Sequence, residues 1–176
     1  GGEIDRLPRI PGAALGSGRR PLREHEIDLI VDRLRERRVH GIALIGGNGT
    51  MWTCNRIARR SEQLGLKLQV IGIPKTVDND VMETDHTPGF GSAARFVAHA
   101  VRDLSVDLQA MIGFEGIRII ETMGRNSGWL AASAMLAVPS SGNTPYRAYI
   151  PELAFELDAM LQDAALLTLD LTLEAL

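Results

Sequence analysis

Apolar side chains recur along the chain at spacings typical of helices. In residues 24–37 they form one stripe of Ile27, Ile30, Val31 and Leu34, which predicts an amphipathic helix. The same spacing predicts further helices over residues 50–64, 92–104, 127–137 and 153–165. Much of the chain is therefore expected to bury one face of a helix.

Short apolar runs lie between these helical segments and predict buried strands. They cover residues 41–45, 68–73 and 116–122, with a shorter candidate over residues 147–151. Residues 166–176 alternate apolar and polar side chains and fit either a strand or a helix. Because strands and helices alternate, we expect an α/β fold, a three-layer sandwich around a parallel sheet with right-handed crossovers.

Two loops and two lobes complete the expected organisation. Residues 9–20 are rich in Pro, Gly and Ser and predict a loop, and residues 81–89 predict a second one. The chain is expected to pass from one lobe to the other near residues 89–100. This gives lobes of residues 1–90 and 91–176.

Composition narrows the class of protein without naming a function. The 176 residues suffice for one or two domains, and a net charge of −3 argues against a dedicated nucleic-acid or membrane-surface protein. The single cysteine, Cys54, cannot form an internal disulfide, which favours a reducing compartment. No apolar run is long enough for a membrane span. We expect a cytoplasmic protein without nucleic-acid or membrane partners.

The densest group of reactive side chains follows the predicted strand 68–73. Residues Pro74 to Asp80 read Pro-Lys-Thr-Val-Asp-Asn-Asp, and open parallel sheets bind ligands at the carboxyl ends of their strands. The two aspartates, Asp78 and Asp80, offer a proton acceptor and a metal ligand. Lys75 offers a point charge for a transferring phosphoryl group. The alternative is a surface turn whose carboxylates only cap backbone amides.

Two further turns follow predicted strands. The first reads Gly46-Gly47-Asn48-Gly49-Thr50, and its glycines let backbone N–H groups approach a phosphate at a helix N-terminus. An ordinary tight strand–helix turn is the alternative. The second reads Met123-Gly124-Arg125 and would be unremarkable without the other two.

Together, and in this order, the three turns resemble those of the 6-phosphofructokinase family, which phosphorylates fructose 6-phosphate. The resemblance covers residues 10 to about 160. It implies the family's two-lobed fold, Mg²⁺ as cofactor, ATP or pyrophosphate as co-substrate, a place in glycolysis, and an allosteric homo-oligomer, either dimer or tetramer. NAD kinases and lipid kinases have a similar Gly-Gly-x-Gly-Thr loop, but the other two turns argue against them.

The resemblance also implies a role for each matching residue. Asp78 is the catalytic base that accepts the proton of the sugar 1-hydroxyl, Thr76 orients that hydroxyl or a phosphoryl oxygen, and Lys75 assists. Asp80 and Asn48 position magnesium, although the family usually has aspartate where this chain has Asn48. The implied sugar-phosphate residues are Thr76, Val77, Asp78, Met123, Gly124 and Arg125. The implied phosphoryl-donor residues are Arg19, Gly46, Gly47, Asn48, Gly49 and Thr50, with Glu152 as a candidate for an effector site.

Two positions bear on the phosphoryl donor. The family has Gly at the position of Gly49 in ATP users and Asp in pyrophosphate users. It tends to have Gly at the position of Lys75 in simple bacterial ATP enzymes and Lys in pyrophosphate enzymes. Because an acidic side chain at position 49 is what excludes the α-phosphate of ATP, we expect ATP as the donor, with pyrophosphate as the alternative.

The resemblance accounts for only about half of a typical family subunit. The family begins with a strand and a Gly-rich loop that contact the nucleotide, and it continues into a glutamate and an Arg/His cluster that hold the sugar. The arginine that usually precedes the third turn aligns with Gly116, which weakens anion binding. We therefore expect a partial subunit, a chain joined across gaps, or a degenerate paralogue. A truncated subunit that binds nucleotide or sugar phosphate without turnover is the alternative to an enzyme.

Overall fold

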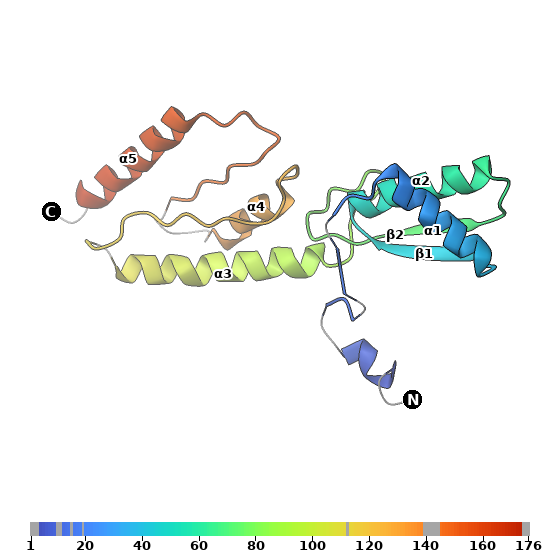
Figure 1. Ribbon diagram of the computed structural model, residues 1–176. Coiled ribbons are helices and arrows are strands. Elements are labelled where there is room, and N and C mark those ends of the chain that lie inside the picture. The colour runs from blue at the N-terminus through green and yellow to red at the C-terminus, as the bar shows by residue number, and fades with distance from the viewer. Residues whose placement is uncertain are drawn as a thin grey trace. The chain divides into compact units, whose positions relative to one another are not determined.

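The computed structural model describes residues 4–9, 12–14, 16–18, 20–111, 113–138 and 145–173 (Figure 1). The elements in chain order are η1 (Ile4–Arg9), α1 (Glu24–Glu36), β1 (Gly41–Gly46), α2 (Asn48–Gln63), β2 (Gln69–Pro74), α3 (Phe90–Ala110), α4 (Trp129–Ser133), η2 (Ala134–Ala137) and α5 (Leu157–Leu173). Both η elements are 3₁₀ helices. No helix in the described ranges is long and apolar enough to cross a bilayer.

Strands β1 and β2 form a two-stranded parallel sheet. At one end the backbone N–H of Gln69 donates to His40 O at 2.9 Å, and at the other the N–H of Lys75 donates to Gly46 O at 2.8 Å. The two bonds keep the same offset along the chain, as parallel pairing requires. Helix α2 connects the strands, so the predicted βαβ order and the predicted α/β class are confirmed.

Helix α2 packs against one face of this sheet. A side chain at Gly72 would approach the sulfur of Met51 at 2.7 Å and that of Cys54 at 3.4 Å, so a glycine permits the close approach of strand and helix. Cys54 is buried, and this burial raises the pKa of its thiol. Residues of the opposite strand face remain exposed, Ile45 by 67% and Ile71 by 57%.

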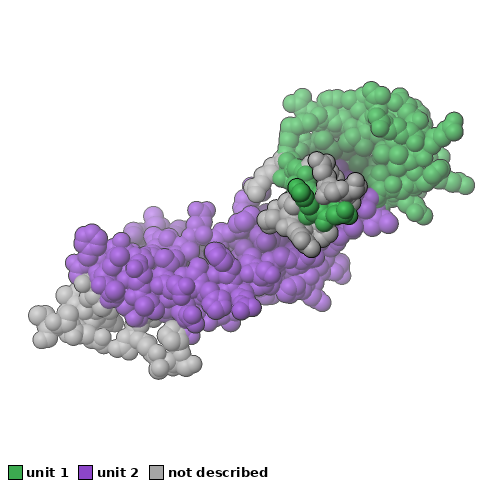
Figure 2. Space-filling view, turned by 90° about the horizontal axis from the view of Figure 1, so that it is seen from below, with its two compact units in different colours: residues 1–42, 55–70 green, residues 43–54, 71–176 purple. Residues whose placement is uncertain are grey.

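The chain divides into two compact units, shown in green and purple in Figure 2. One comprises residues 1–42 with 55–70, and the other comprises residues 43–54 with 71–176. This division follows contacts within the chain and cuts through β1, α2 and β2. It does not test the lobe boundary expected near residues 89–100, which stays a prediction.

In the first unit, α1 is joined to the later turns of α2. Arg60 Nε donates to the carboxylate of Asp28 at 2.6 Å, and Arg56 forms an ion pair with Glu24. The core of this unit contains Ile27, Val31 and Ile57, which are at most 2% exposed. Of the four apolar positions on the predicted stripe, Ile27 and Val31 are buried, whereas Ile30 and Leu34 are only half-buried.

The N-terminus of α1 is held by the carboxylate of Glu26. The guanidinium of Arg20 donates to it at 2.5 and 3.0 Å, and the backbone N–H of Arg23 donates at 2.7 Å. The hydrogen bonds from Arg20, and next that from Arg23, lower the pKa of Glu26 to about 2. This ion pair fixes the direction in which the chain enters α1.

In the second unit, α3 packs against α4 and η2. The ring of Phe90 lies 5.3 Å from that of His86 and 6.1 Å from that of Trp129, both edge to face. The buried apolar residues on these helices are Ala94, Val101, Leu130 and Ala137. The helix predicted over residues 127–137 is therefore present as a short α-helix followed by a 3₁₀ turn.

Two predicted strands are absent from the described chain. Residues 116–122 and 147–151 have no strand pairing, and Ile119 is 81% exposed. Strand propensity reflects how well a side chain fits a pleated, half-buried sheet surface. Within the described residues the sheet consists of β1 and β2 alone, so these segments have no neighbouring strand to pair with. Residues 166–173 continue α5, which decides their open assignment in favour of a helix.

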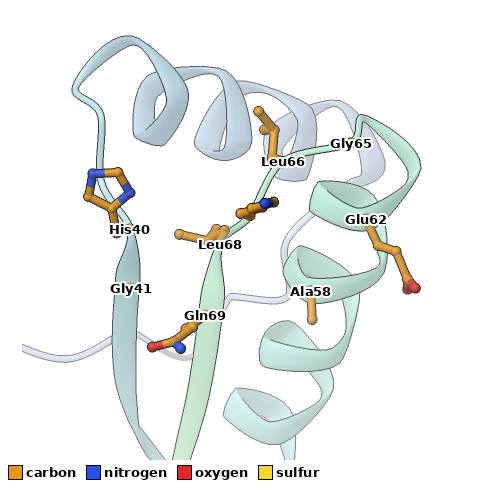
Figure 3. A pocket seen from close by; sticks show the side chains of 9 residues that line it. His40, Gly41, Ala58, Glu62, Gly65, Leu66, Leu68 and Gln69 are labelled. Atoms are coloured by element: carbon orange, nitrogen blue, oxygen red, sulfur yellow. The ribbon is translucent and has the colours of Figure 1, made fainter.

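A hollow lies where the two strands begin (Figure 3). Its lining residues are His40, Gly41, Ala58, Glu62, Gly65, Leu66, Lys67, Leu68 and Gln69. Parallel sheets bind ligands at the other ends of their strands, the carboxyl ends. The hollow is therefore not the candidate site.

Candidate active site

The glycine turn and the aspartate turn lie side by side in the second unit, because each follows one of two paired strands. A side chain at Gly47 would contact Thr76 Cβ at 3.6 Å and Lys75 O at 3.8 Å. The side-chain amide of Asn48 donates to Asp80 O at 3.1 Å. The predicted metal-site residues Asn48 and Asp80 are thus neighbours.

The glycine turn is tightly folded at its first position. A side chain at Gly46 would lie 2.1 Å from Thr50 Oγ1, so a larger residue cannot occupy this position without a shift. The backbone N–H of Thr50 donates to Gly47 O at 2.9 Å, which starts the first turn of α2. At Gly49, by contrast, an added side chain would meet nothing within 4 Å. The turn is therefore tightly packed at Gly46 and has free space at Gly49.

The aspartate turn is held by its own side chains. The backbone N–H of Asp78 donates to Thr76 Oγ1 at 3.1 Å, and Asn79 adopts a left-handed backbone with φ of 54°. One carboxylate oxygen of Asp78, Oδ1, is buried and has no hydrogen-bond partner among the residues that the structure describes. Buried polar atoms are normally paired, so the unpaired Oδ1 marks the carboxylate of Asp78 as a group whose partner the described residues do not supply.

The third turn contacts the aspartate turn through Ser127. Its hydroxyl donates to Asp78 O at 3.0 Å, and the residue is 6% exposed. Gly124 has a φ of +117°, and a side chain there would lie 2.2 Å from Ser127 O. The aspartate turn therefore contacts the glycine turn through Asn48 and contacts Ser127, the residue two positions after the third turn.

Ser127 was not among the residues predicted for the site. A serine at the start of an expected helix is most simply explained as a helix N-cap. That explanation gives no reason to expect a contact with a distant turn. No spacing in the sequence connects it with Asp78, which lies 49 residues earlier. Only the fold brings the two together.

The predicted effector residue Glu152 caps the start of α4. Its Oε1 accepts the backbone N–H of Gly128 at 2.8 Å. A side chain at Gly128 would lie 2.5 Å from Ile150 Cβ and 2.6 Å from Glu152 Oε2, so the two segments are in close contact. This contact is local, and the effector role of Glu152 stays a prediction.

The remaining predicted residues differ in how they are placed. Lys75, Met123 and Arg125 are exposed, as ligand-binding side chains often are before a ligand is present. Val77 packs near Gly89, where a side chain would meet its Cγ1 at 3.4 Å. Arg19 lies outside the described residues.

Arg118 is the arginine nearest to Gly116, the position where a cation was expected. It donates to the carboxylates of Asp107 at 2.8 Å and Glu115 at 2.5 Å. The hydrogen bonds that Arg118 donates to Asp107 and next to Glu115 raise the pKa of its guanidinium. Its guanidinium is therefore occupied by acidic partners and does not replace an arginine at Gly116.

The meeting of a glycine turn at a helix N-terminus with a turn of carboxylates suits phosphoryl transfer, in which positioning and charge neutralisation dominate. The family model described as phosphofructokinase matches residues 2–171. The chain belongs to the phosphofructokinase family, whose named members among its relatives are phosphotransferases.

Three curated relatives show the range of the family around this chain. It is 46% identical over 160 residues to a sulfofructose kinase of Alkalicoccus urumqiensis, covering 91% of this chain and 42% of the relative. It is 38% identical over 164 residues to a pyrophosphate–fructose 6-phosphate 1-phosphotransferase of Xanthomonas campestris, covering 90% and 39%. It is 36% identical over 155 residues to an ATP-dependent 6-phosphofructokinase of Borreliella burgdorferi, covering 88% and 33%.

A solved structure gives the same assignment. The pyrophosphate-dependent phosphofructokinase of Marinobacter aquaeolei matches with a TM-score of 0.76 and 33% identity, over 90% of this chain and 40% of that one. The chain thus spans about two fifths of the length of the proteins it resembles, as the expectation of a partial subunit requires. The predicted family and fold are confirmed.

Proposed function

We propose that this chain carries the phosphoryl-donor loop and the catalytic turn of an ATP-dependent 6-phosphofructokinase. The reaction transfers the γ-phosphoryl group of ATP to the 1-hydroxyl of fructose 6-phosphate and gives fructose 1,6-bisphosphate. The observation that carries the proposal is the contact between the glycine turn and the aspartate turn, made by Asn48 and Asp80, beside the unpaired Oδ1 of Asp78. Donor and base are thereby adjacent.

Asp78 is the general base in this proposal. Its carboxylate accepts the proton of the sugar 1-hydroxyl as that oxygen attacks the γ-phosphorus, and the bond from phosphorus to the β-phosphate oxygen breaks. The buried Oδ1 provides an acceptor that no described side chain competes for. Thr76, whose hydroxyl accepts the N–H of Asp78, holds the turn beside the reacting groups.

Charge on the phosphates is neutralised by Lys75 and by the backbone amides at the start of α2. Asn48 and Asp80 are the residues that would hold Mg²⁺, since amide and carboxylate oxygens are suitable ligands. Mg²⁺ is usually held by one or two carboxylates together with substrate phosphates. The described residues contain no cluster of three His, Cys, Asp or Glu that could hold a metal ion without the substrate. When bound, the ion would neutralise charge between the donor phosphates.

Gly49 supports ATP as the donor. An added Cβ at Gly49 would meet no atom of the described residues within 4 Å, which leaves room beside its Cα for a phosphate. Pyrophosphate is the alternative, because Lys75 matches the pyrophosphate type and relatives of both types exist. An assay with both donors in parallel separates the two.

A sulfofructose acceptor is the second candidate, favoured by a specific feature of the anion site. A sulfo group carries one negative charge, whereas a phosphate monoester carries nearly two at neutral pH. Gly116 supplies no cation, and Arg118 is occupied by Asp107 and Glu115. Fewer cations suit the less charged group, and a sulfofructose kinase is 46% identical to this chain.

The test is a coupled assay of the purified chain with Mg²⁺, in which ATP and pyrophosphate are each combined with fructose 6-phosphate and with sulfofructose. Turnover of fructose 6-phosphate with ATP, lost in Asp78→Asn, is the expected result. Turnover of sulfofructose but not of fructose 6-phosphate would show that sulfofructose is the acceptor. Binding of ATP or sugar phosphate by calorimetry without any turnover would instead establish a non-catalytic binding subunit.

The family resemblance also supports a proposal for the setting of the reaction. We propose a cytoplasmic, glycolytic enzyme that works as a homo-oligomer, a dimer or tetramer under allosteric control. Light scattering at several concentrations should give a mass that is a multiple of that of the chain.

A further inference from the structure

Asn79 is the residue of the aspartate turn with no role in the reaction described above. It is 6% exposed and adopts a left-handed backbone with φ of 54°, which is uncommon for a residue with a side chain. Its Nδ2 donates to Asp85 O at 3.1 Å, and its Oδ1 accepts the backbone N–H of Thr87 at 2.8 Å. Asn79 therefore ties the turn to the loop that follows it.

Thr87 completes this attachment from the other side. It is fully buried, and its hydroxyl donates to Thr76 O at 2.6 Å. The hydroxyl also lies 3.1 Å from Asn79 Oδ1, a longer contact that can share the same proton. One side chain thus contacts the residue before Val77 and the residue after Asp78, on either side of the base.

Asn79 and Thr87 are buried although both have polar side chains. Asn79 and Thr87 bury polar groups, which is costly unless every group is paired, and here their side-chain polar groups are paired. A hydrogen-bonded group that spans a turn limits the backbone angles on both sides of its central residue. The central residue here is Asp78, whose own Oδ1 is left unpaired.

We propose that Asn79 and Thr87 form a buried bracket that positions Asp78 for proton transfer, an inference that rests on the proposed function for its kinetic consequence. The bracket holds the backbone from Thr76 to Asp80 in one arrangement. Thr87 is a positioning residue, since it acts through the turn and does not touch the reacting atoms. Ser127, which binds Asp78 O, supports the same residue from the third turn.

The first readout does not depend on activity. Hydrogen exchange of the backbone amides over residues 74–81 is measured in the wild-type chain, in Thr87→Val, which keeps the shape and removes the hydroxyl, and in Thr87→Ser, which keeps the hydroxyl. We expect exchange in this segment to rise about tenfold in Thr87→Val, as the loss of a buried hydrogen bond allows, and to return toward wild type in Thr87→Ser. Asn79→Gly, which permits the left-handed backbone without the amide, should raise exchange likewise.

The matched control is Ser133→Ala. This variant also removes a buried hydroxyl, one that donates to Leu130 O at 2.7 Å within α4, away from the aspartate turn. Its exchange over residues 74–81 should equal that of the wild type. A rise in the control as large as that in Thr87→Val would mean that any buried hydroxyl loss loosens the turn, and it would overturn the bracket.

The second readout is kinetic. In Thr87→Val, kcat should fall by about ten- to a hundredfold while the dissociation constant of the sugar phosphate stays the same, because binding does not require the exact placement of the base. Thr87→Ser should restore kcat. Equal losses in kcat and binding, or no rescue by serine, would overturn the positioning role. If the wild-type chain turns over no acceptor, the proposed function fails, and the exchange measurement alone decides whether the bracket exists.

Discussion

The turns after β1 and β2 and the turn after residues 116–122 are alike in sequence pattern but differ in support. The first two follow strands that pair with each other, and their backbones are joined by the bond from Lys75 N to Gly46 O. The third follows a segment without a strand, where Ile117 is 52% and Ile119 is 81% exposed. A strand needs both a suitable sequence and a partner of matching direction.

The third turn is nonetheless held at the site by different means. Ser127 binds Asp78 O, and Glu152 caps the residue that follows Ser127. Side chains therefore perform for this turn what strand pairing performs for the other two. Substitutions in the two regions test this contrast, and those in the paired region should have the greatest effect.

Replacement of Asp78 by asparagine tests the paired region. The variant keeps the shape of the side chain but removes the base, so kcat should fall by about 10²- to 10⁴-fold. Binding of the sugar phosphate, measured by calorimetry, should remain near that of the wild type. An active Asp78→Asn protein would refute the assigned mechanism.

Replacement of Gly124 by alanine tests the third turn. Its φ of +117° and the approach to Ser127 O at 2.2 Å both oppose a side chain. Chemical denaturation should show a loss of about 2–4 kcal/mol in the free energy of unfolding. Gly113→Ala is the matched control, because Gly113 also has a positive φ, +92°, but an added side chain meets nothing within 4 Å. A similar loss in both variants would show that the backbone angle alone matters, not the contact with Ser127.

Replacement of Gly49 by aspartate tests the open end of the glycine turn. The site has room for the side chain, so the fold should be unchanged and only the charge should act. ATP binding should weaken by about tenfold or more through like-charge repulsion, while pyrophosphate binding changes less. Unchanged use of ATP by this variant would remove the argument from Gly49.

The smallest effect is expected far along the chain from the turns, at α1. The pKa of Glu26 is lowered to about 2 from 4.5, so its stabilisation is complete above pH 4.5 and is lost as the pH falls toward 2. Glu26→Gln should lower the thermal midpoint slightly near neutral pH and reduce its dependence on pH in this acidic window. The measurement is a series of thermal melts between about pH 6 and pH 2.5. An unaltered acid dependence would show that Glu26 does not contribute to it.

The sequence predicted those helices and strands whose packing partners lie within the described chain. The stripe in residues 24–37 predicted α1 (Glu24–Glu36), and two apolar runs predicted β1 and β2 within a residue or two. Residues 116–122 failed because pairing is a property of the whole sheet and not of the run. The predicted helix over residues 153–165 begins later, at Leu157. The spacing of apolar residues indicates a helix but does not determine the residue at which it begins.

The site was predictable in its turns and unpredictable in their connections. Each turn carries a dense local pattern, and the structure brings Asn48, Asp80 and Asp78 together as adjacent strand ends require. Ser127 and Thr87 have no such pattern, because a single buried hydroxyl looks the same in sequence whether it caps a helix or supports a distant turn. Long-range hydrogen bonds of this kind appear only when the fold is known.

The single cysteine has a practical consequence of its own. Cys54 is buried where α2 meets β2, and its raised pKa keeps the thiol protonated and unreactive. Because Cys54 is only 8% exposed, an alkylating reagent should react with it faster when α2 moves away from β2. The rate at which Cys54 is alkylated would thus report how often α2 and β2, which carry the glycine turn and the aspartate turn, move apart. No label has to be introduced into the protein.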